Sequence, residues 1–246
     1  MPSLNPDSRG PFVIRRLSAN PENLHLGLML ALTFSTGVVD AVGYLGLDRV
    51  FTGNMTGNVV ILGMALAGAD GLPIVGPVIA LLSFMLGAVI AGRILRPIKA
   101  GWTHRSTSLL TAVAVIMVGL AITLLLYGGT PPKPQEYIVT LFLAIAMGIQ
   151  AGTARHIGVK DVTTVVVTST ITGFAADSRL AGGKGQPWFR RAAAIFLIAL
   201  GAAVGALLLR LGLGWGVSLS ALITVAVAVL GHVGARQHAT AGSDAN

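Results

Sequence analysis

Residues 32–58 form the stretch LTFSTGVVDAVGYLGLDRVFTGNMTGN, which decides the fold of this chain. Its first part belongs to an apolar run long enough to cross a bilayer, which takes about 20 residues, and this part contains one acidic residue, Asp40. Its second part is Thr52-Gly-Asn-Met-Thr-Gly-Asn58, a polar motif that leads directly into further apolar residues. The stretch therefore predicts a membrane-spanning helix followed at once by a short, interrupted segment.

The composition of the chain places it in a membrane. Hydrophobic residues make up 54% of the 246 residues and charged residues 11%, and the mean hydropathy is +0.80. Soluble domains carry about 25% charged residues, so lipid must cover much of this chain. The net charge of +8 lies in short clusters between apolar runs, so we expect no nucleic-acid partner. The absence of cysteine excludes disulfides, thiol catalysis and cysteine metal sites.

Six apolar runs are long enough to span the bilayer, and two further segments are shorter. The runs lie near 24–47, 72–95, 107–127, 136–156, 190–210 and 213–233, and the short segments near 52–69 and 162–180. The sequence predicts an all-α polytopic membrane protein with one transmembrane domain over residues 24–233. A polar cytoplasmic N-terminus (1–23) and a cytoplasmic tail (234–246) are expected on either side of it.

The lysines and arginines show whether the short segments cross, because cytoplasmic loops hold an excess of both. If all eight segments cross, the two sides receive 9 and 8 of the 17 basic residues. If the two short segments each enter and leave on one side, the sides receive 14 and 3. The bias predicts six crossings, two broken or re-entrant segments, and both termini in the cytoplasm.

A weak internal repeat fits the same arrangement. Gly37-Val-Val-Asp40 precedes the motif at 52–58, and Gly148-Ile-Gln150 precedes Thr168-Ser-Thr-Ile-Thr-Gly173. Each half, about 24–127 and 136–233, would hold three crossings and one interrupted segment. Because three is odd, the halves would be inverted relative to each other. Interrupted segments in corresponding positions of inverted repeats are typical of a transporter's central site.

Asp40 is the one acidic residue inside a clear spanning run. A carboxylate at membrane depth costs at least about 2.5–3.5 kcal/mol, so it should face a cavity or a partner. We interpret it as a proton- or cation-coupling group or a solute ligand. The alternatives are a neutral or hydrogen-bonded carboxyl that fixes helix packing, and a carboxyl near enough to the outer interface to be hydrated.

The motif at 52–58 predicts a helix that begins at membrane depth. Its first N–H groups and its positive dipole end would point into the protein. Side-chain amides and hydroxyls can bind an anion or a polar neutral solute. Capping and close packing are the alternative, since Gly53 and Gly57 have the spacing of a helix contact. The first-half candidates for substrate binding are Asp40, Thr52, Asn54, Thr56 and Asn58.

The second half offers a weaker counterpart. Gln150 corresponds roughly to Asp40, and Thr168 and Thr172 repeat the four-residue spacing. Hydroxyls in membrane helices often bond to their own backbone, however, and a buried amide can serve packing alone. The second-half candidates are Gln150, Thr168, Thr170 and Thr172.

Other patterns bear on partners and on catalysis. The pairs Gly148/Gly152, Gly201/Gly205 and Gly212/Gly216 predict close helix contacts, within the chain or in a homo-oligomer. The histidines lack metal-ligand spacing, so neither a metal nor a cofactor is expected. Hydrolase elbows, zinc-protease motifs and phosphate-binding loops are absent from the sequence. We expect no enzyme of a familiar design.

The stretches VDAVGYL (39–45) and VFTGNMTGNVVILG (50–63) resemble the YoaK-like family of bacterial membrane proteins, a domain of unknown function (DUF1275). The family's second-half pattern looks matched by Gly148-x-Gln150 and Thr172-Gly173, although Phe174 stands where the first motif has Asn. The resemblance implies a multi-pass protein of the bacterial inner membrane with about six helices. It supplies no substrate.

Three functions follow from these patterns. The first is a secondary transporter or channel for a small polar or ionic solute. The second is a non-transporting scaffold or assembly protein, which would tolerate a dry cluster of Thr and Asn. The third, an intramembrane enzyme acting on lipid, requires a histidine beside Asp40. Substrate, coupling ion, direction and oligomeric state do not follow from the sequence.

Overall fold

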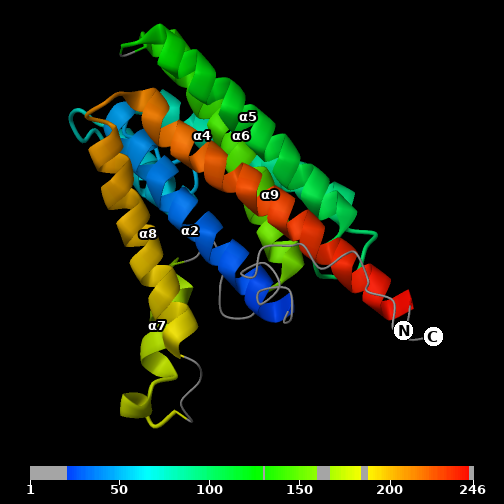
Figure 1. The fold of residues 1–246 in the computed structure, drawn as a ribbon. Coiled ribbons are helices and arrows are strands. Elements are labelled where there is room, and N and C mark those ends of the chain that lie inside the picture. Colours follow the sequence, from blue (N-terminus) through cyan, green and yellow to red (C-terminus); the bar gives the residue numbers. More distant parts are fainter. Residues whose placement is uncertain (1–20, 130, 160–166, 184–187, 244–246) are drawn as a thin grey trace, which may run out of the picture.

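The computed structural model describes residues 21–129, 131–159, 167–183 and 188–243. The predicted N-terminal segment up to residue 20 and the start of the predicted segment 162–180 lie outside these residues. Within them every regular element is a helix, and six helices are long and apolar enough to cross a membrane (Figure 1). They are α2 (Pro21–Gly46), α4 (Val75–Leu95), α5 (His104–Tyr127), α6 (Lys133–Ile157), α8 (Trp188–Leu208) and α9 (Leu213–Ser243).

Three shorter elements complete the described fold. They are α3 (Met55–Leu66), α7 (Val167–Ala176) and the 3-10 helix η1 (Arg179–Ala181). Local signals set several helix ends: Thr103 caps α5 by accepting a bond from the Ser106 amide, and Gly128 ends that helix with a φ of 68°. The last helix, α9, continues beyond its predicted end at 233, through a stretch that contains no proline.

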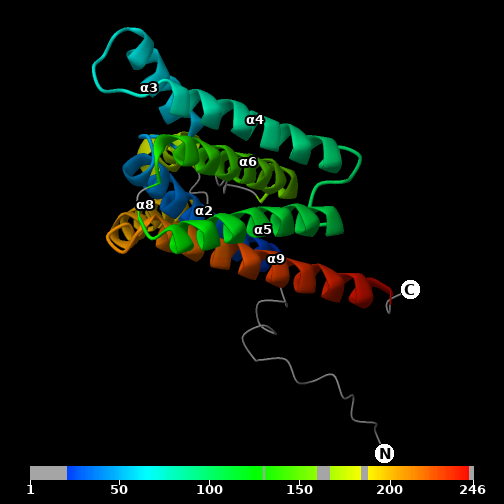
Figure 2. The ribbon, with the colours of Figure 1, turned by 90° about the horizontal axis from the view of Figure 1, so that it is seen from above.

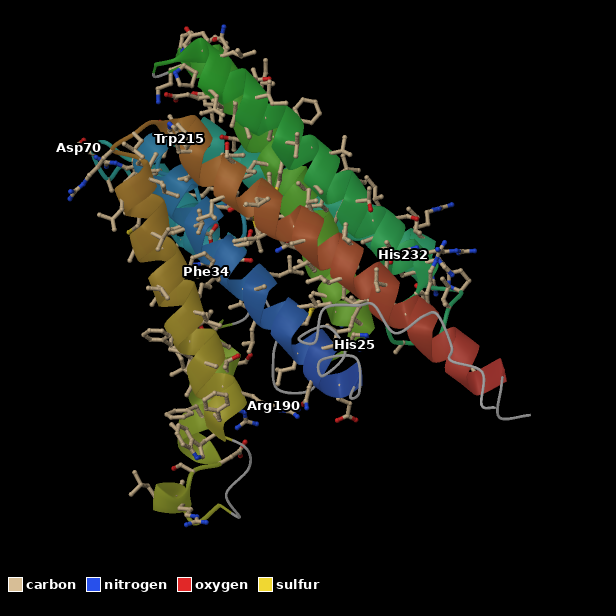
Figure 3. The ribbon with its side chains drawn as sticks, in the orientation of Figure 1. His25, Phe34, Asp70, Arg190, Trp215 and His232 are labelled. Atoms are coloured by element: carbon tan, nitrogen blue, oxygen red, sulfur yellow. The ribbon has the colours of Figure 1, made fainter. Side chains whose placement is uncertain are left out.

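The helices share two ends. At the first, the His25 ring stacks on Trp102, and the His156 ring bonds the Lys99 carbonyl. At the second, Asp48 after α2 forms an ion pair with Lys133 at the start of α6. We name these the His25 end and the Asp48 end. Figure 3 shows His25, Arg190 and His232 toward one end, and Asp70 and Trp215 toward the other.

Each short helix lies in a segment of chain that begins and finishes at the same end of the bundle. Gly76, at the start of α4, packs against Asp48, so the segment that holds α3 begins and finishes at the Asp48 end. Helix α7 follows α6 and precedes α8 at the His25 end, where Arg191 of α8 bonds the Gly173 carbonyl. Six crossings with α2 beginning and α9 finishing at one end agree with the prediction.

Helices α2 and α6 form the centre of the bundle. The apolar windows of these two helices are 67% and 61% buried, against 28% for α4 and 17% for α8. Helix α2 packs against α8 and α9, helix α6 packs against α4 and α5, and α5 lies along α9. Figure 2 shows α6 between α4 and α5. The outer helices therefore present apolar side chains to lipid, and the inner pair holds many of the buried polar ones, including Asp40 and Gln150.

Glycines bring two helix pairs into backbone contact. A Cβ on Gly37 of α2 would lie 2.2 Å from the Ile198 carbonyl oxygen of α8, and one on Gly201 would lie 2.1 Å from that of Phe34. Gly148 of α6 and Gly87 of α4 make the same reciprocal contact in the other pair. Such an approach suits small residues alone. The predicted close contacts at Gly148 and Gly201 are therefore made within the chain.

Candidate functional site

The chain turns back into the bundle directly after α2. The Val50 amide donates to the Gly43 carbonyl over 3.3 Å, and a Cβ on Gly43 would lie 2.4 Å from the Val50 carbonyl oxygen. A side chain at position 43 would therefore collide with the backbone of Val50. Residues 47–53 run back along α2, close to Gly43 and then to Asp40. We call residues 47–54, which end at the cap of α3, the return loop.

Asp40 holds the inner tip of the return loop. Its Oδ1 atom accepts hydrogen bonds from the backbone amides of Thr52, at 3.0 Å, and Gly53, at 2.7 Å. Asp40 lies six residues before the end of α2, about 9 Å along the helix axis, and is 9% exposed. The return loop therefore reaches the depth of Asp40 before α3 begins.

Gly53 lets the tip of the return loop pack between α2 and α6. A Cβ at this position would lie 2.9 Å from the methyl carbon of Thr36 and 3.1 Å from that of Met147. Thr36 belongs to α2 and Met147 to α6. The inner end of the return loop thus meets both central helices, and any larger residue at position 53 would separate them.

The two motif asparagines bond to the backbone of the same segment. The Asn58 Oδ1 atom accepts from the Phe51 amide at 2.9 Å, and its Nδ2 atom donates to the Phe51 carbonyl at 2.6 Å. Asn54 caps α3 by accepting from the Gly57 amide at 3.4 Å. Asn58 is buried, whereas Asn54 and Thr56 are exposed. In this geometry both asparagines support the shape of the loop.

Gln150 joins this cluster from α6. Its side chain is fully buried, its Nε2 atom donates to the Thr36 hydroxyl at 3.3 Å, and its Oε1 atom has no hydrogen-bond partner. The buried Thr52 hydroxyl also lacks one. Thr36 was not among the residues predicted from the sequence. Its position four residues before Asp40, and hence on the same helix face, could have indicated it. We call Thr36, Asp40, Thr52 and Gln150 the central polar cluster.

The second-half threonines lie elsewhere. Thr168, Thr170 and Thr172 belong to α7, which packs against α8 at the His25 end. Thr172 donates to the Thr168 carbonyl at 2.9 Å, the backbone bond that competes with a ligand role. Thr170 is buried, and Thr168 and Thr172 are exposed. The structure thus joins Gln150 to the first-half residues and leaves these threonines apart from them.

A groove of about 380 Å³ opens beside Asp40 between α2 and α8. The Tyr44 and Phe51 rings, which stack on each other with centroids 4.9 Å apart, both line it. Its wall on α8 is aliphatic. The residues that line the groove are Gly37, Asp40, Ala41, Tyr44, Leu45, Phe51, Ile198, Ala199 and Ala202.

Other ionisable groups stay away from Asp40. Among the described residues no cation pairs with its carboxyl group, and no group of three or more His, Asp or Glu side chains is placed to hold a metal ion. His25 lies fifteen residues earlier in α2, about 22 Å along the axis, and His156 lies at the His25 end. Neither of these histidines is a partner for Asp40.

Comparison with known proteins finds a matching family and a similar transmembrane protein. Residues 28–230 match the family described as "Protein of unknown function (DUF1275)". The chain is similar to the UPF0700 transmembrane protein YoaK of Bacillus subtilis (strain 168), with 32% identity over 188 residues, which cover 73% of this chain and 82% of that protein. No solved structure matches the chain.

Proposed function

The chain belongs to the DUF1275 family of transmembrane proteins, and we propose that it is a secondary transporter or channel for a small polar or ionic solute across the bacterial inner membrane. The solute would bind at the central polar cluster. Asp40 would supply charge, and Thr52 and Gln150 would supply hydrogen bonds.

The unpartnered oxygens of this cluster carry the proposal. Gln150 Oε1 and Thr52 Oγ1 are buried without a hydrogen-bond partner, next to residues that touch Asp40. A buried polar group left unsatisfied costs about 1–3 kcal/mol, and native proteins leave few. A polar solute or water that reached either oxygen would satisfy it.

The position of the cluster also favours transport. Gly53 of the return loop lies about 9–15 Å inside α2, between the levels of Asp40 and Thr36, where it meets the two central helices just before α3 begins. Broken helices whose ends lie at membrane depth form the binding sites of many secondary transporters. A helix kept only for packing has no need of this interruption.

Helix packing supports the predicted inverted repeat. A shift of 111 residues carries Phe34 and Gly37 onto Ile145 and Gly148, and a shift of 114 carries Phe84 and Gly87 onto Ile198 and Gly201. These residues make matching backbone contacts in the two helix pairs. With the shift of 111, Asp40 corresponds to position 151, one residue after Gln150. The proposed repeat therefore relates the helix contacts of the two halves but not their polar side chains. The short helices α3 and α7 lie at opposite ends, as inversion requires.

The basic residues favour a cytoplasmic His25 end. Four basic residues lie from the last turn of α4 to the first turn of α5, namely Arg93, Arg96, Lys99 and Arg105. Arg155 lies in the last turn of α6. Cytoplasmic loops hold such an excess. With this orientation α3 would enter from the outer surface and α7 from the cytoplasm.

A labelled-solute screen in proteoliposomes tests the proposal. The purified protein should take up at least one class of small solute, driven by a proton, sodium or electrical gradient. Asp40→Asn should abolish coupled uptake while the protein stays folded in the membrane. Asp70→Asn, which alters an exposed loop carboxylate, is the matched control and should transport normally. Normal uptake by Asp40→Asn would remove this carboxylate from the mechanism.

One observation favours a second candidate, a non-transporting scaffold or assembly protein. The side chains of Asn54 and Asn58 bond within the loop that carries them, as in a purely structural motif. The two candidates differ in hydration. If the cluster is a transport site, Thr52→Cys should react with a water-soluble thiol reagent. If the protein is a scaffold, that cysteine should stay dry, and only an exposed Ala69→Cys should react.

A further inference from the structure

The groove beside Asp40 has the features of a ligand site. Small-molecule pockets have volumes of about 300–1,000 Å³ and apolar or aromatic walls with few polar groups. This groove, at about 380 Å³, offers apolar and aromatic side chains and one carboxyl group. Its α8 side belongs to the least buried of the spanning helices, so it opens where lipid meets the bundle.

Charge selects the kind of ligand. Among the described residues Asp40 has no cationic partner, and backbone amides alone satisfy its Oδ1 atom. A carboxylate in such an apolar setting attracts a positive charge more strongly than it would in water. An anion would be repelled, and a neutral apolar molecule would gain nothing from the carboxylate.

The aromatic pair adds a second preference for a cation. The stacked Tyr44 and Phe51 rings line the same groove as Asp40. Aromatic faces attract ammonium groups, and quaternary ammonium ligands are recognised by such faces. Inorganic cations would have to exchange their hydration shell for this mostly apolar wall, whereas an organic cation has apolar surface to bury.

We infer that the groove between α2 and α8 binds an amphipathic organic cation, with its charged group against Asp40 and its apolar part against Tyr44, Phe51 and α8. This inference rests on the proposed function in one respect: Asp40 belongs both to the groove and to the central polar cluster, so a cation held in the groove would be the solute that enters the cluster. Binding itself can be measured without transport.

Binding of radiolabelled benzyltrimethylammonium to the purified full-length protein in detergent tests the inference. The compound should bind saturably. Neopentylbenzene, which has the same shape with carbon in place of the charged nitrogen, should compete at least tenfold more weakly. Equal competition by the neutral compound would show a groove for lipid chains and would overturn the inference.

Matched variants locate the site. Asp40→Asn should weaken binding at least tenfold, and Tyr44→Leu about threefold. In case Asp40→Asn unfolds, Ala199→Leu fills the groove from the lipid-facing side of α8 and should abolish binding. Ala203→Leu, an exposed alanine on α8 outside the groove lining, should leave binding unchanged. Unaltered binding by folded Asp40→Asn, or by Ala199→Leu, would contradict the inference.

The two proposals fail in different ways. If the cation binds as described but no solute is taken up by proteoliposomes, the binding site stands and the transport proposal fails. If another class of solute is taken up and the cation does not bind, transport stands and the assignment of the groove is overturned.

Discussion

Asp40 combines a structural bond with a carboxyl group that has no cationic partner among the described residues. One of its oxygens orders the backbone of Thr52 and Gly53, and the side chain also borders the groove. Successive backbone amides that converge on one acceptor form an anion-binding concavity, which here is filled by a side chain of the same chain. A change in the charge of Asp40 would therefore act on the return loop and on any bound ligand together.

Gly148 gives a sharp test of packing at the residue scale. Gly148→Ala would place a Cβ 2.2 Å from the Phe84 carbonyl oxygen of α4, and such overpacking costs about 1–3 kcal/mol. Gly92→Ala, on α4 with nothing within 4 Å, should be neutral or stabilise by up to about 1 kcal/mol. Thermal unfolding of both variants in detergent should give a lower midpoint for the first alone. Equal midpoints would show that the α4–α6 contact is loose.

Among the elements, the return loop and α3 are held in part by their own side chains, in addition to Asp40 of α2. The side-chain amide of Asn58 accepts from the backbone N–H of Phe51 and donates to its backbone C=O, the same pair of bonds that a neighbouring β-strand would make. Phe51 in turn packs against Gly57, where a Cβ would lie 2.6 Å from the ring. The motif from Thr52 to Asn58 thus stabilises its own loop conformation through local contacts, which explains why Gly and Asn recur in it.

Asn58→Ala tests this role. Removal of two hydrogen bonds, each contributing about 0.5–1.5 kcal/mol, should speed hydrogen exchange at the amides of Phe51, Thr52 and Gly53 by about tenfold or more. Thr123→Ala is a suitable control, because that exposed hydroxyl bonds only within α5. Unchanged exchange in Asn58→Ala would mean that Asp40 alone holds the loop.

For the molecule as a whole, the arrangement of ends defines a topology that can be measured. The chain contains no cysteine, so each introduced cysteine is the only one. Ala69→Cys lies in the exposed loop after α3, and Ala100→Cys in the exposed loop after α4. In whole cells a membrane-impermeant reagent should label the first directly and the second only after permeabilisation. The reverse pattern would place the His25 end outside.

Most of the architecture was open to prediction from the residues. Apolar length and the distribution of lysine and arginine gave six crossings, because lipid imposes both constraints on each segment separately. The positions of the short segments followed from their Gly, Asn and Thr content. Asp40 stood out for the same reason, since a carboxylate in a spanning run is costly wherever the rest of the chain lies.

Contacts between segments distant in the sequence could not be predicted in this way. The bond from Gln150 to Thr36 joins residues 114 positions apart, and the groove needs α8 beside α2. The separation of the α7 threonines from Asp40 likewise depends on which helix α7 packs against. Local composition predicts whether a segment enters the membrane, since that is a transfer from water to lipid. Which side chains then meet depends on how helices pack against one another, and that is fixed only when all of them are assembled.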